Sequence, residues 1–534
     1  MVNYCAVLMD TISIQKYVFA SNRLLDNLGA SQIVGILFKE LAVSSLADAC
    51  SISEEETQKI MSKWRENPEL LLMKVDPGMP FEIGVSGGGK ALIFFRDPAH
   101  ARQFIKQFSR QMLIQAPGLQ LATAVNEKFI LDDQCFSEQL TNLYKELTRN
   151  RNRYFALTEL PHHGITAVCP KSGTSLNMFD EKEKNFISQG TVVKQKAAKV
   201  EQDKRNSKLA EKHSNCRFTN QLDQLGQQEG DSYTAVIHID GNNMGKWFQQ
   251  STDLIDYRKR SINMAQITED SFWCLVDKVV SLIPECKDEE QGFDLKKDQY
   301  KYFLPIRPVI IGGDDITFIC HAKLALYLAE EFLRVWRKKA NSDSGLTPFG
   351  LPENREFSAC AGVVIAKTKY PFYRTYQFAE QSCATAKRSA RHEETGLWID
   401  FQLISGTKSG SLEKIREDDK KAHGIKLYFG PYCIEDKNKK SIQGLKSGIL
   451  LFAQDKYWAK NKLKELRTAF NLGEEVVDNF ITGMKAQNGS LPAISQLCEK
   501  SKFKEKGFAD KETPYPDILE MMDFYPIFLL KGGA

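Results

Sequence analysis

Apolar residues in the first 130 positions alternate with glycine-rich breaks. An apolar run at 4–9 stops at Asp10, and two further runs within 82–95 flank a Gly-Gly-Gly turn. Apolar residues at helical spacing over 97–113 precede another short apolar run at 119–125. Short apolar runs around glycine turns predict strands, whereas a spacing of three to four residues predicts a helix. This part of the chain therefore predicts the order strand, helix, hairpin, helix, strand.

The same order is predicted again after position 232. A nearly continuous apolar run at 233–239 ends at Asp240, and two apolar runs within 307–320 flank Gly-Gly-Asp-Asp. A helical pattern over 322–339 precedes a last strand-like run at 358–366. Glycine permits the positive φ angles of a tight hairpin turn, and the β-branched and aromatic residues on either side favour paired strands.

A nearly constant offset relates the two copies. Asp10 and Asp240 are 230 positions apart, and Gly88 and Gly313 are 225 positions apart. We interpret this offset as a degenerate internal duplication. The predicted fold class is α+β, with two ferredoxin-like βαββαβ units whose apolar first strands lie at the centre of each sheet. The first copy retains the frame but has Gly-Gly-Gly-Lys where the second has Gly-Gly-Asp-Asp.

Polar and charged patterns divide the rest of the chain. Residues 192–214 carry many alternating charges, which predicts a solvated helix or a mobile linker. Three helical patterns follow position 405, at 445–451, 458–470 and 474–484. The predicted domains are a degenerate unit at 1–130, a connector at 131–231, a Gly-Gly-Asp-Asp unit at 232–405 and a C-terminal helical domain at 406–534.

Composition narrows the function classes. The chain has 72 basic and 68 acidic residues and a net charge of +4, so any contact with nucleic acid must be local. Twelve cysteines occur without a Cys-x-x-Cys pair, which favours reduced thiols and a cytoplasmic location. No apolar run approaches the length of a membrane span, and we expect none. His162, His163 and Cys169 are close in sequence but lack the second pair of ligands usual for zinc.

Two adjacent carboxylates, Asp314 and Asp315, are expected at the tip of the second hairpin. Two such charges about 4 Å apart repel by roughly 4 kcal/mol at an effective dielectric of 20, so they need a counter-ion, a shared proton or full solvation. An isolated Asp-Asp pair is also ordinary turn chemistry. Asp240, at the end of the neighbouring central strand, adds a third acid. Two divalent ions, Mg²⁺ or Mn²⁺, held by these acids would suit nucleotidyl transfer.

A small polar run follows Asp240. Asn243 and Gly245 lie where a strand is expected to give way to a helix, and free backbone N–H groups at such a junction can bind phosphate oxygens. By itself this pattern is weakly specific, because many strand-to-helix turns share it.

Three cations are expected near the end of a helix at 373–391. Lys387 and Arg391 are four residues apart and face one way, so we expect them to bind a triphosphate. The alternative is that cations there only stabilise the helix C-terminus, and for Arg388 we favour it. Asp400 ends an apolar run, where a lone aspartate is usually a turn starter, and we do not assign it to the site.

Taken together, these motifs resemble the palm of the CRISPR polymerase family, the cyclase-bearing large subunits of type III CRISPR effectors and their stand-alone relatives. The motifs are Asp240 with GNNMG, then IIGGDDITF, SACAGVVIAKTKYP and AEQSCATAKRSAR, within residues 232–405. The N-terminal stretch MDTISIQKYVFASNRLLDNLGAS resembles that family's first, non-catalytic palm. More distantly, the second copy is similar to GGDEF diguanylate cyclases and class III nucleotide cyclases.

The resemblance implies a nucleotidyltransferase, either a nucleotide cyclase or a cyclic oligonucleotide synthase. Such an enzyme would join ATP, or another nucleoside triphosphate, with release of pyrophosphate and make a signalling nucleotide in antiviral defence. It also implies roles for six residues: metal binding by Asp240 and Asp314, metal binding or hydroxyl activation by Asp315, triphosphate binding by Lys387, and close nucleotide access at Gly312 and Gly313.

Two departures from that family concern partners. The sequence has no His-Asp dipeptide, so we expect no nuclease domain of the usual kind, and the family's paired-cysteine zinc element is not recognisable. We expect a stand-alone cyclase that is activated by RNA, a protein or a small ligand, as a homo-oligomer or in an effector complex. The alternative is a catalytically silent nucleotide-binding sensor or ribonucleoprotein scaffold subunit, which the decayed first copy suggests. A template-dependent polymerase is a weaker alternative, because no extended basic, aromatic-rich channel is evident.

Overall fold

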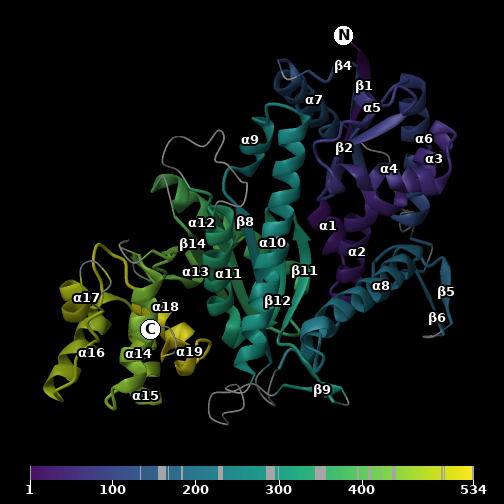
Figure 1. Ribbon diagram of the computed structural model, residues 1–534. Coiled ribbons are helices and arrows are strands. Elements are labelled where there is room, and N and C mark those ends of the chain that lie inside the picture. The colour runs from purple at the N-terminus through teal and green to yellow at the C-terminus, as the bar shows by residue number, and fades with distance from the viewer. Residues whose placement is uncertain are drawn as a thin grey trace.

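Both predicted hairpins form, and each belongs to its own sheet (Figure 1). The fold is taken from a computed structural model of the chain. It describes residues 2–132, 134–153, 164–165, 167–181, 184–226, 232–283, 295–298, 300–342, 356–393, 396–406, 410–422, 424–435, 440–494, 497 and 500–531.

The first sheet has four strands in the order β2-β3-β1-β4. Its strands are β1 (Asn3–Ile12), β2 (Phe81–Gly87), β3 (Lys90–Phe95) and β4 (Gln120–Ile130). This order, with the first strand at the centre, is that of the predicted ferredoxin-like unit. The crossover helices α2 (Leu24–Ile36) and α6 (Pro98–Gln115) pack on one face. Helix α7 (Phe136–Arg151) packs on the other face.

The second sheet repeats this arrangement and extends it, in the order β11-β12-β8-β13-β14-β17. Its strands are β8 (Tyr233–Gly241), β11 (Ile306–Gly312), β12 (Asp315–His321), β13 (Ala359–Lys367), β14 (Trp398–Ile404) and β17 (Tyr432–Cys433). Helices α10 (Leu254–Leu282) and α11 (Ala325–Ala340) cover one face. Helix α12 (Phe372–His392) covers the other face, where Gly362 of β13 lies so close that a Cβ would be 1.9 Å from the Ala379 carbonyl oxygen.

The predicted duplication is confirmed, and over the first elements its offset is constant. The first three elements of the first copy begin 230 positions before their counterparts. The pairs are β1 at Asn3 and β8 at Tyr233, α1 (Ile14–Val18) and α9 (Met244–Gln249), and α2 at Leu24 and α10 at Leu254. Ser13 and Asn243, which precede α1 and α9, both have a positive φ, of 54° and 61°. Few non-glycine residues adopt this conformation, so the two copies share the same unusual turn.

Helix α8 (Gln189–Lys212) joins the two sheets. The charge pattern predicted a solvated helix or a mobile linker here. A helix is present, but part of its surface is buried against its neighbours. It packs so tightly on α2 that a Cβ on Gly29 would lie 1.7 Å from the Lys194 carbonyl oxygen. Glu201 of the same helix forms a buried ion pair with Arg307 of β11. His162 and His163 lie outside the described residues.

The three helices predicted after position 405 are present; the first and the third are longer than their apolar patterns, and the second is shifted by two residues. They are α14 (Ile442–Gln454), α15 (Lys460–Leu472) and α16 (Glu474–Ala486), and they lie together at the yellow end of the chain (Figure 1). Trp458 and Phe470 are buried among these helices, and Phe480 is half-buried. Because β17 pairs with β14, the second sheet continues past position 405. None of the helices in the described ranges combines the length and apolar character needed to cross a membrane.

Candidate nucleotide site at the second hairpin

The turn of the second hairpin contains only one of the two adjacent acids. Gly312 of β11 pairs directly with Asp315 of β12, so Gly313 and Asp314 form a two-residue turn. Gly313 has a φ of 52°, which suits this kind of turn. We expected both carboxylates at the tip, but Asp315 is the first residue of the strand. Gly312 does not use a positive φ; a Cβ there would lie 3.1 Å from the Asp315 Oδ1.

Strand pairing brings the third acid to the same place. Asp315 pairs directly with Asp240 of β8, and side chains of directly paired residues lie on the same face of a sheet. Asp314 reaches the same strand end, because the Gly241 N–H donates to the Asp314 carbonyl oxygen at 3.3 Å. A Cβ on Gly241 would lie 3.3 Å from the Asp314 Oδ2. The structure thus brings together Asp240, Asp314 and Asp315.

Two of the three acids, Asp314 and Asp315, have raised pKa values. Burial, and then the charge of Asp240, raise the pKa of Asp314 to about 6. Burial and the charges of Asp314 and Asp240 raise the pKa of Asp315 well above its usual value. A positive charge at this place would relieve the repulsion and restore the charged forms.

Lys387 supplies one such charge from α12. Its Nζ donates to the Asp240 Oδ2 at 2.5 Å and to the Gly241 carbonyl oxygen at 2.9 Å. The Lys387 side chain is 16% exposed and that of Asp240 is 36% exposed, so the pair is open to solvent on one side. Arg391 lies exposed in the last turn of the helix. Arg388 points elsewhere and forms an ion pair with Glu413 at 3.2 Å.

The polar run after Asp240 forms the start of α9 (Met244–Gln249). Asn243 and Gly245 are both exposed there, and a Cβ on Gly245 would meet open space. The neighbouring Asn242 is instead used for structure, because its N–H donates to the Ser358 carbonyl oxygen at 2.8 Å. The backbone after Asp240 is therefore anchored on one side and open on the other.

Three further residues contribute to the site and were not found from the sequence. Thr268 of α10 donates its hydroxyl to the Gly313 carbonyl oxygen at 2.6 Å, and Trp336 of α11 donates to the Thr268 Oγ1 at 3.2 Å. No short-range signal marks these two contacts. Glu380 of α12 has its pKa raised by burial and by the charge of Asp240. Glu380 lies two helical turns before Lys387, so the two residues share one face of the helix. That spacing could have identified Glu380 from the sequence.

The donor atoms at the hairpin suit a hard divalent cation, although the residues are not arranged as a complete cage. Within the described ranges, no group of three or more His, Cys, Asp or Glu side chains is placed to hold a metal ion. Mg²⁺ is commonly held by one or two carboxylates together with substrate phosphates. Asp240 and Asp314 fit that mode of binding, because their carboxylates flank the end of β8.

The first copy contains an equivalent acid and base. Asp10 lies two residues before the end of its central strand. It binds Arg151 at 3.0 Å, and Arg151 is in the last turn of α7, the helix that occupies the place of α12. The Asp10 side chain is only 3% exposed. Asp10 pairs directly with Lys90, as Asp240 pairs with Asp315. The first copy therefore has one acid, which is buried and ion-paired. The second copy has three acids, which are more exposed to solvent.

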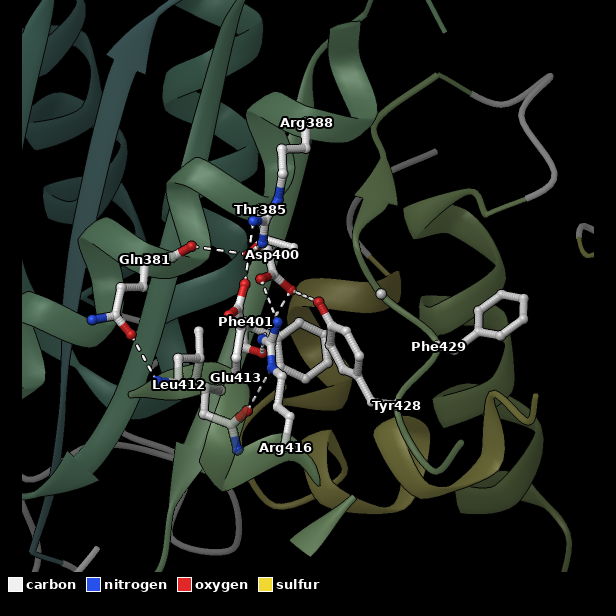
Figure 2. A network of polar contacts seen from close by, with 12 residues as sticks. Gln381, Thr385, Arg388, Asp400, Phe401, Leu412, Glu413, Arg416, Tyr428 and Phe429 are labelled. Carbon is white, nitrogen blue, oxygen red and sulfur yellow. Dashed lines mark hydrogen bonds and ion pairs between the residues drawn. The ribbon is translucent and has the colours of Figure 1, made fainter. Parts of the chain in front are cut away.

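Asp400 is not the turn residue that its position suggested. It is fully buried within β14 and accepts hydrogen bonds from Arg416 at 2.9 and 3.2 Å and from the Tyr428 hydroxyl (Figure 2). This network joins the sheet to the segment after position 405. Asp400 therefore serves structure, in agreement with its exclusion from the candidate site.

The raised pKa of Asp314 predicts a pH-dependent effect of Asp314→Asn on stability. The pKa rises from 3.8 to about 6, so between these values the folded state binds a proton that the unfolded chain does not. Its stabilising effect is complete below about pH 4 and is lost as the pH rises through about 6. We expect the metal-free variant to be more stable than wild type by about 1–3 kcal/mol at pH 7 and equally stable at pH 4, in urea unfolding. A difference that does not change with pH would contradict the shift.

Comparison with known protein families finds a match within the second copy. Residues 233–395 match the family model described as Cas10/Cmr2, second palm domain. No curated protein matches the chain.

Several solved structures are similar over nearly the whole chain at low identity. One is described as a Csm1-Csm4 cassette in complex with one ATP, with 12% identity, a TM-score of 0.49, and coverage of 98% of this chain and 70% of that chain. The cassette in complex with cA4 has 13% identity, a TM-score of 0.45 and coverage of 98% and 70%. The apo cassette has 13% identity, a TM-score of 0.45 and coverage of 98% and 70%.

Proposed function

Because residues 233–395 match the model of the Cas10/Cmr2 second palm domain, in agreement with the resemblance of the sequence, we propose that this chain is a nucleotidyltransferase. It joins ATP or another nucleoside triphosphate, releases pyrophosphate and makes a cyclic or oligomeric signalling nucleotide in antiviral defence. One observation carries the proposal: the carboxylates of Asp240, Asp314 and Asp315 lie at the same end of the second sheet, and the ammonium group of Lys387 binds one of them, that of Asp240. These are groups that nucleotidyl transfer requires.

The carboxylates are proposed to hold Mg²⁺ or Mn²⁺, in two sites. Asp240 and Asp314 bind metal, and Asp315 binds metal or helps to activate the attacking 3′-hydroxyl. Such ions polarise the α-phosphate and stabilise the attacking and leaving oxygens. The raised pKa values of Asp314 and Asp315 support this role, because a site whose acids repel one another favours bound cations.

The remaining candidate residues are proposed to position the nucleotide. Lys387, which binds Asp240, would hold the triphosphate, and Arg391 would add a second charge one turn later. The glycines of the hairpin allow close approach of the nucleotide. Exposed backbone at Asn243 and Gly245 provides further phosphate contacts.

A silent nucleotide-binding sensor or ribonucleoprotein scaffold subunit is the second candidate. The first copy supports it, because its acid Asp10 is buried against Arg151 and has no adjacent acids at the hairpin. Such decay shows that this frame can persist without a set of catalytic acids. In either case we propose a cytoplasmic protein with an RNA or protein activator, working as a homo-oligomer or within an effector complex.

Incubation with mixed nucleoside triphosphates distinguishes the two candidates. With Mg²⁺ or Mn²⁺, an enzyme releases pyrophosphate and forms phosphodiester products that mass spectrometry identifies by base and size. A sensor returns the nucleotide intact while its melting temperature rises with ligand. Because an activator can be needed, the assay includes samples with added RNA. Intact nucleotide under every condition would overturn the proposed catalysis.

Lys387→Ala is expected to weaken nucleotide use, whereas Arg388→Ala is not. Hydrogen bonds to charged groups contribute about 1.5–3 kcal/mol, so the KM for ATP should rise by about 10- to 100-fold when Lys387 is lost. Arg388 is the adjacent cation on the same helix, but it binds Glu413 instead. Steady-state pyrophosphate release measures both variants. Equal effects of the two substitutions would remove Lys387 from the site.

A further inference from the structure

Four side chains of the connector have the sequence spacing of a zinc site. Two residues separate Cys169 from Ser172, and two separate Ser188 from Thr191. The 15 residues 173–187 lie between these two pairs. Two pairs at this spacing are typical of a four-ligand zinc site when all four positions are cysteine. Here only Cys169 is a cysteine, so a search for paired cysteines does not find the pattern.

The fold brings the two pairs together. The first pair lies on a tight turn, in which the Gly173 N–H donates to the Cys169 carbonyl oxygen and the Cys169 N–H donates to the Thr174 carbonyl oxygen, both at 2.8 Å. The paired strands β5 (Met178–Asp180) and β6 (Asn185–Ile187) then return the chain to the second pair, at the start of α8 (Figure 1). Two separate turns of the chain therefore meet, as the two halves of a zinc site do.

Hydrogen bonds link the four side chains to one another. The Ser188 hydroxyl is hydrogen-bonded to the Ser172 hydroxyl and to the Thr191 hydroxyl, each at 2.9 Å. The Cys169 Sγ lies 3.9 Å from the Thr191 Oγ1, within hydrogen-bonding distance for sulfur. All but Ser172 are buried. The cluster thus has four members and is largely closed to solvent, as a structural zinc site is.

The chemistry of the four groups does not fit zinc. Zinc in proteins is bound by cysteine thiolate, histidine or carboxylate, and a neutral hydroxyl is not among its usual ligands. Within the described part of the chain, no group of three or more His, Cys, Asp or Glu side chains is placed to hold a metal ion. One thiol cannot supply the four ligands, so the zinc ion of the family's paired-cysteine element does not fit these residues.

We propose that residues 169, 172, 188 and 191 occupy the four positions of a zinc-type site in which hydrogen bonds between side chains have replaced the metal ion. The cluster would then hold the start of α8 in place without metal. That role matters for the whole fold, because α8 packs closely on Gly29 of α2 and forms the buried ion pair between Glu201 and Arg307.

Restoring the cysteines tests the proposal with the metal alone. The variant Ser172→Cys/Ser188→Cys/Thr191→Cys should bind about one Zn²⁺ per chain more than wild type, in metal analysis after unbound zinc is removed. Added zinc should raise its melting temperature more than that of wild type. Co²⁺ should give the variant the visible spectrum of tetrahedral thiolate coordination. Purified wild type and Cys169→Ser should contain the same amount of zinc.

A second triple variant controls for the number of added cysteines. Thr148→Cys/Ser207→Cys/Ser281→Cys adds three exposed cysteines on three different helices and should gain no zinc. Zinc binding by the restored variant that does not exceed this control would overturn the proposal. Zinc in purified wild type that Cys169→Ser removes would also overturn it, because the site would then hold metal as it stands.

The wild-type hydroxyls provide a test that does not depend on whether the restored variant folds. Ser172→Ala and Ser188→Ala together should destabilise the protein by less than the sum of their separate effects in urea unfolding, because the two side chains share a hydrogen bond. Ser188 also caps α8, since its side chain accepts from the Thr191 N–H at 3.3 Å, but that role does not involve Ser172. Additive effects would mean that Ser188 acts only as the cap, and the proposal would be wrong.

Discussion

Replacing Asp314 and Asp315 together by asparagine is expected to abolish product formation and to leave the protein folded. The two carboxylates are proposed metal ligands, and metal stabilisation of the transferring phosphoryl group amounts to several kcal/mol, or about a thousandfold or more in rate. Pyrophosphate release and product mass spectra measure the loss. Neither side chain is needed for the turn, because the first hairpin forms the same two-residue turn around Gly88 and Gly89 without acids.

The melting temperature of this double variant is expected to equal or exceed that of wild type at neutral pH without metal. Removing two charges relieves the repulsion that raises the pKa values of Asp314 and Asp315. Glu474→Gln with Glu475→Gln is the matched control, because it neutralises two adjacent exposed acids at the start of α16. Product formation by the Asp314/Asp315 variant would remove the acids from the catalytic site. Loss of the fold would show that the acids are structural.

Arg258→Ala is expected to destabilise the protein by about 3–5 kcal/mol, the usual cost of breaking a buried ion pair. Arg258 lies on α10 of the second copy, and its side chain is 0% exposed. It binds Glu82 of the first sheet at 2.8 Å and donates to the Gly84 carbonyl oxygen at 3.0 Å and the Leu70 carbonyl oxygen at 2.9 Å. Its removal leaves a buried carboxylate and several carbonyl oxygens without this partner. Urea unfolding measures the change.

Lys259→Ala provides a control on the same helix. Lys259 also forms an ion pair with the first copy, with Glu69 at 2.7 Å, but its side chain is 47% exposed. Solvent and salt screen such a pair, so we expect no measurable change in the free energy of unfolding. Changing both buried partners, as Arg258→Met with Glu82→Gln, should cost less than Arg258→Met alone, because it leaves no unpaired charge. A mild effect of Arg258→Ala would mean that the two copies are held together by other contacts.

The contacts between the copies bear on the candidate site, because the two hairpin tips touch. Arg258 joins the second copy to the sheet of the first copy. The buried pair of Glu201 with Arg307 joins the connector to the sheet of the second copy. Their loss would change the distance between the two hairpin tips without altering any residue of the site. Arg258→Ala is therefore also expected to weaken nucleotide binding, in proportion to how far the hairpins separate.

Local patterns predicted the strands and hairpins because each depends on neighbouring residues. Apolar runs that end at Asp10 and Asp240 became the central strands β1 and β8, and the glycine turns became tight hairpins. The same reasoning placed α12 and therefore Lys387. It misplaced Asp315, which starts a strand and does not lie in the turn. Turns of two and of four residues differ in their hydrogen bonds, and the residue types did not distinguish between them.

By itself the sequence determined the duplicated frame, the three acids and the cation from α12, because periodicity and motif spacing are local properties of the chain. Tertiary structure alone decided how they meet. The register of β8 with β12 places Asp240 opposite Asp315, and α10 supports the turn through Thr268. The approach of the first hairpin brings Gly88 close to Gly312. These relations join residues far apart in the chain, and their geometry depends on the packing of two sheets and not on any short pattern.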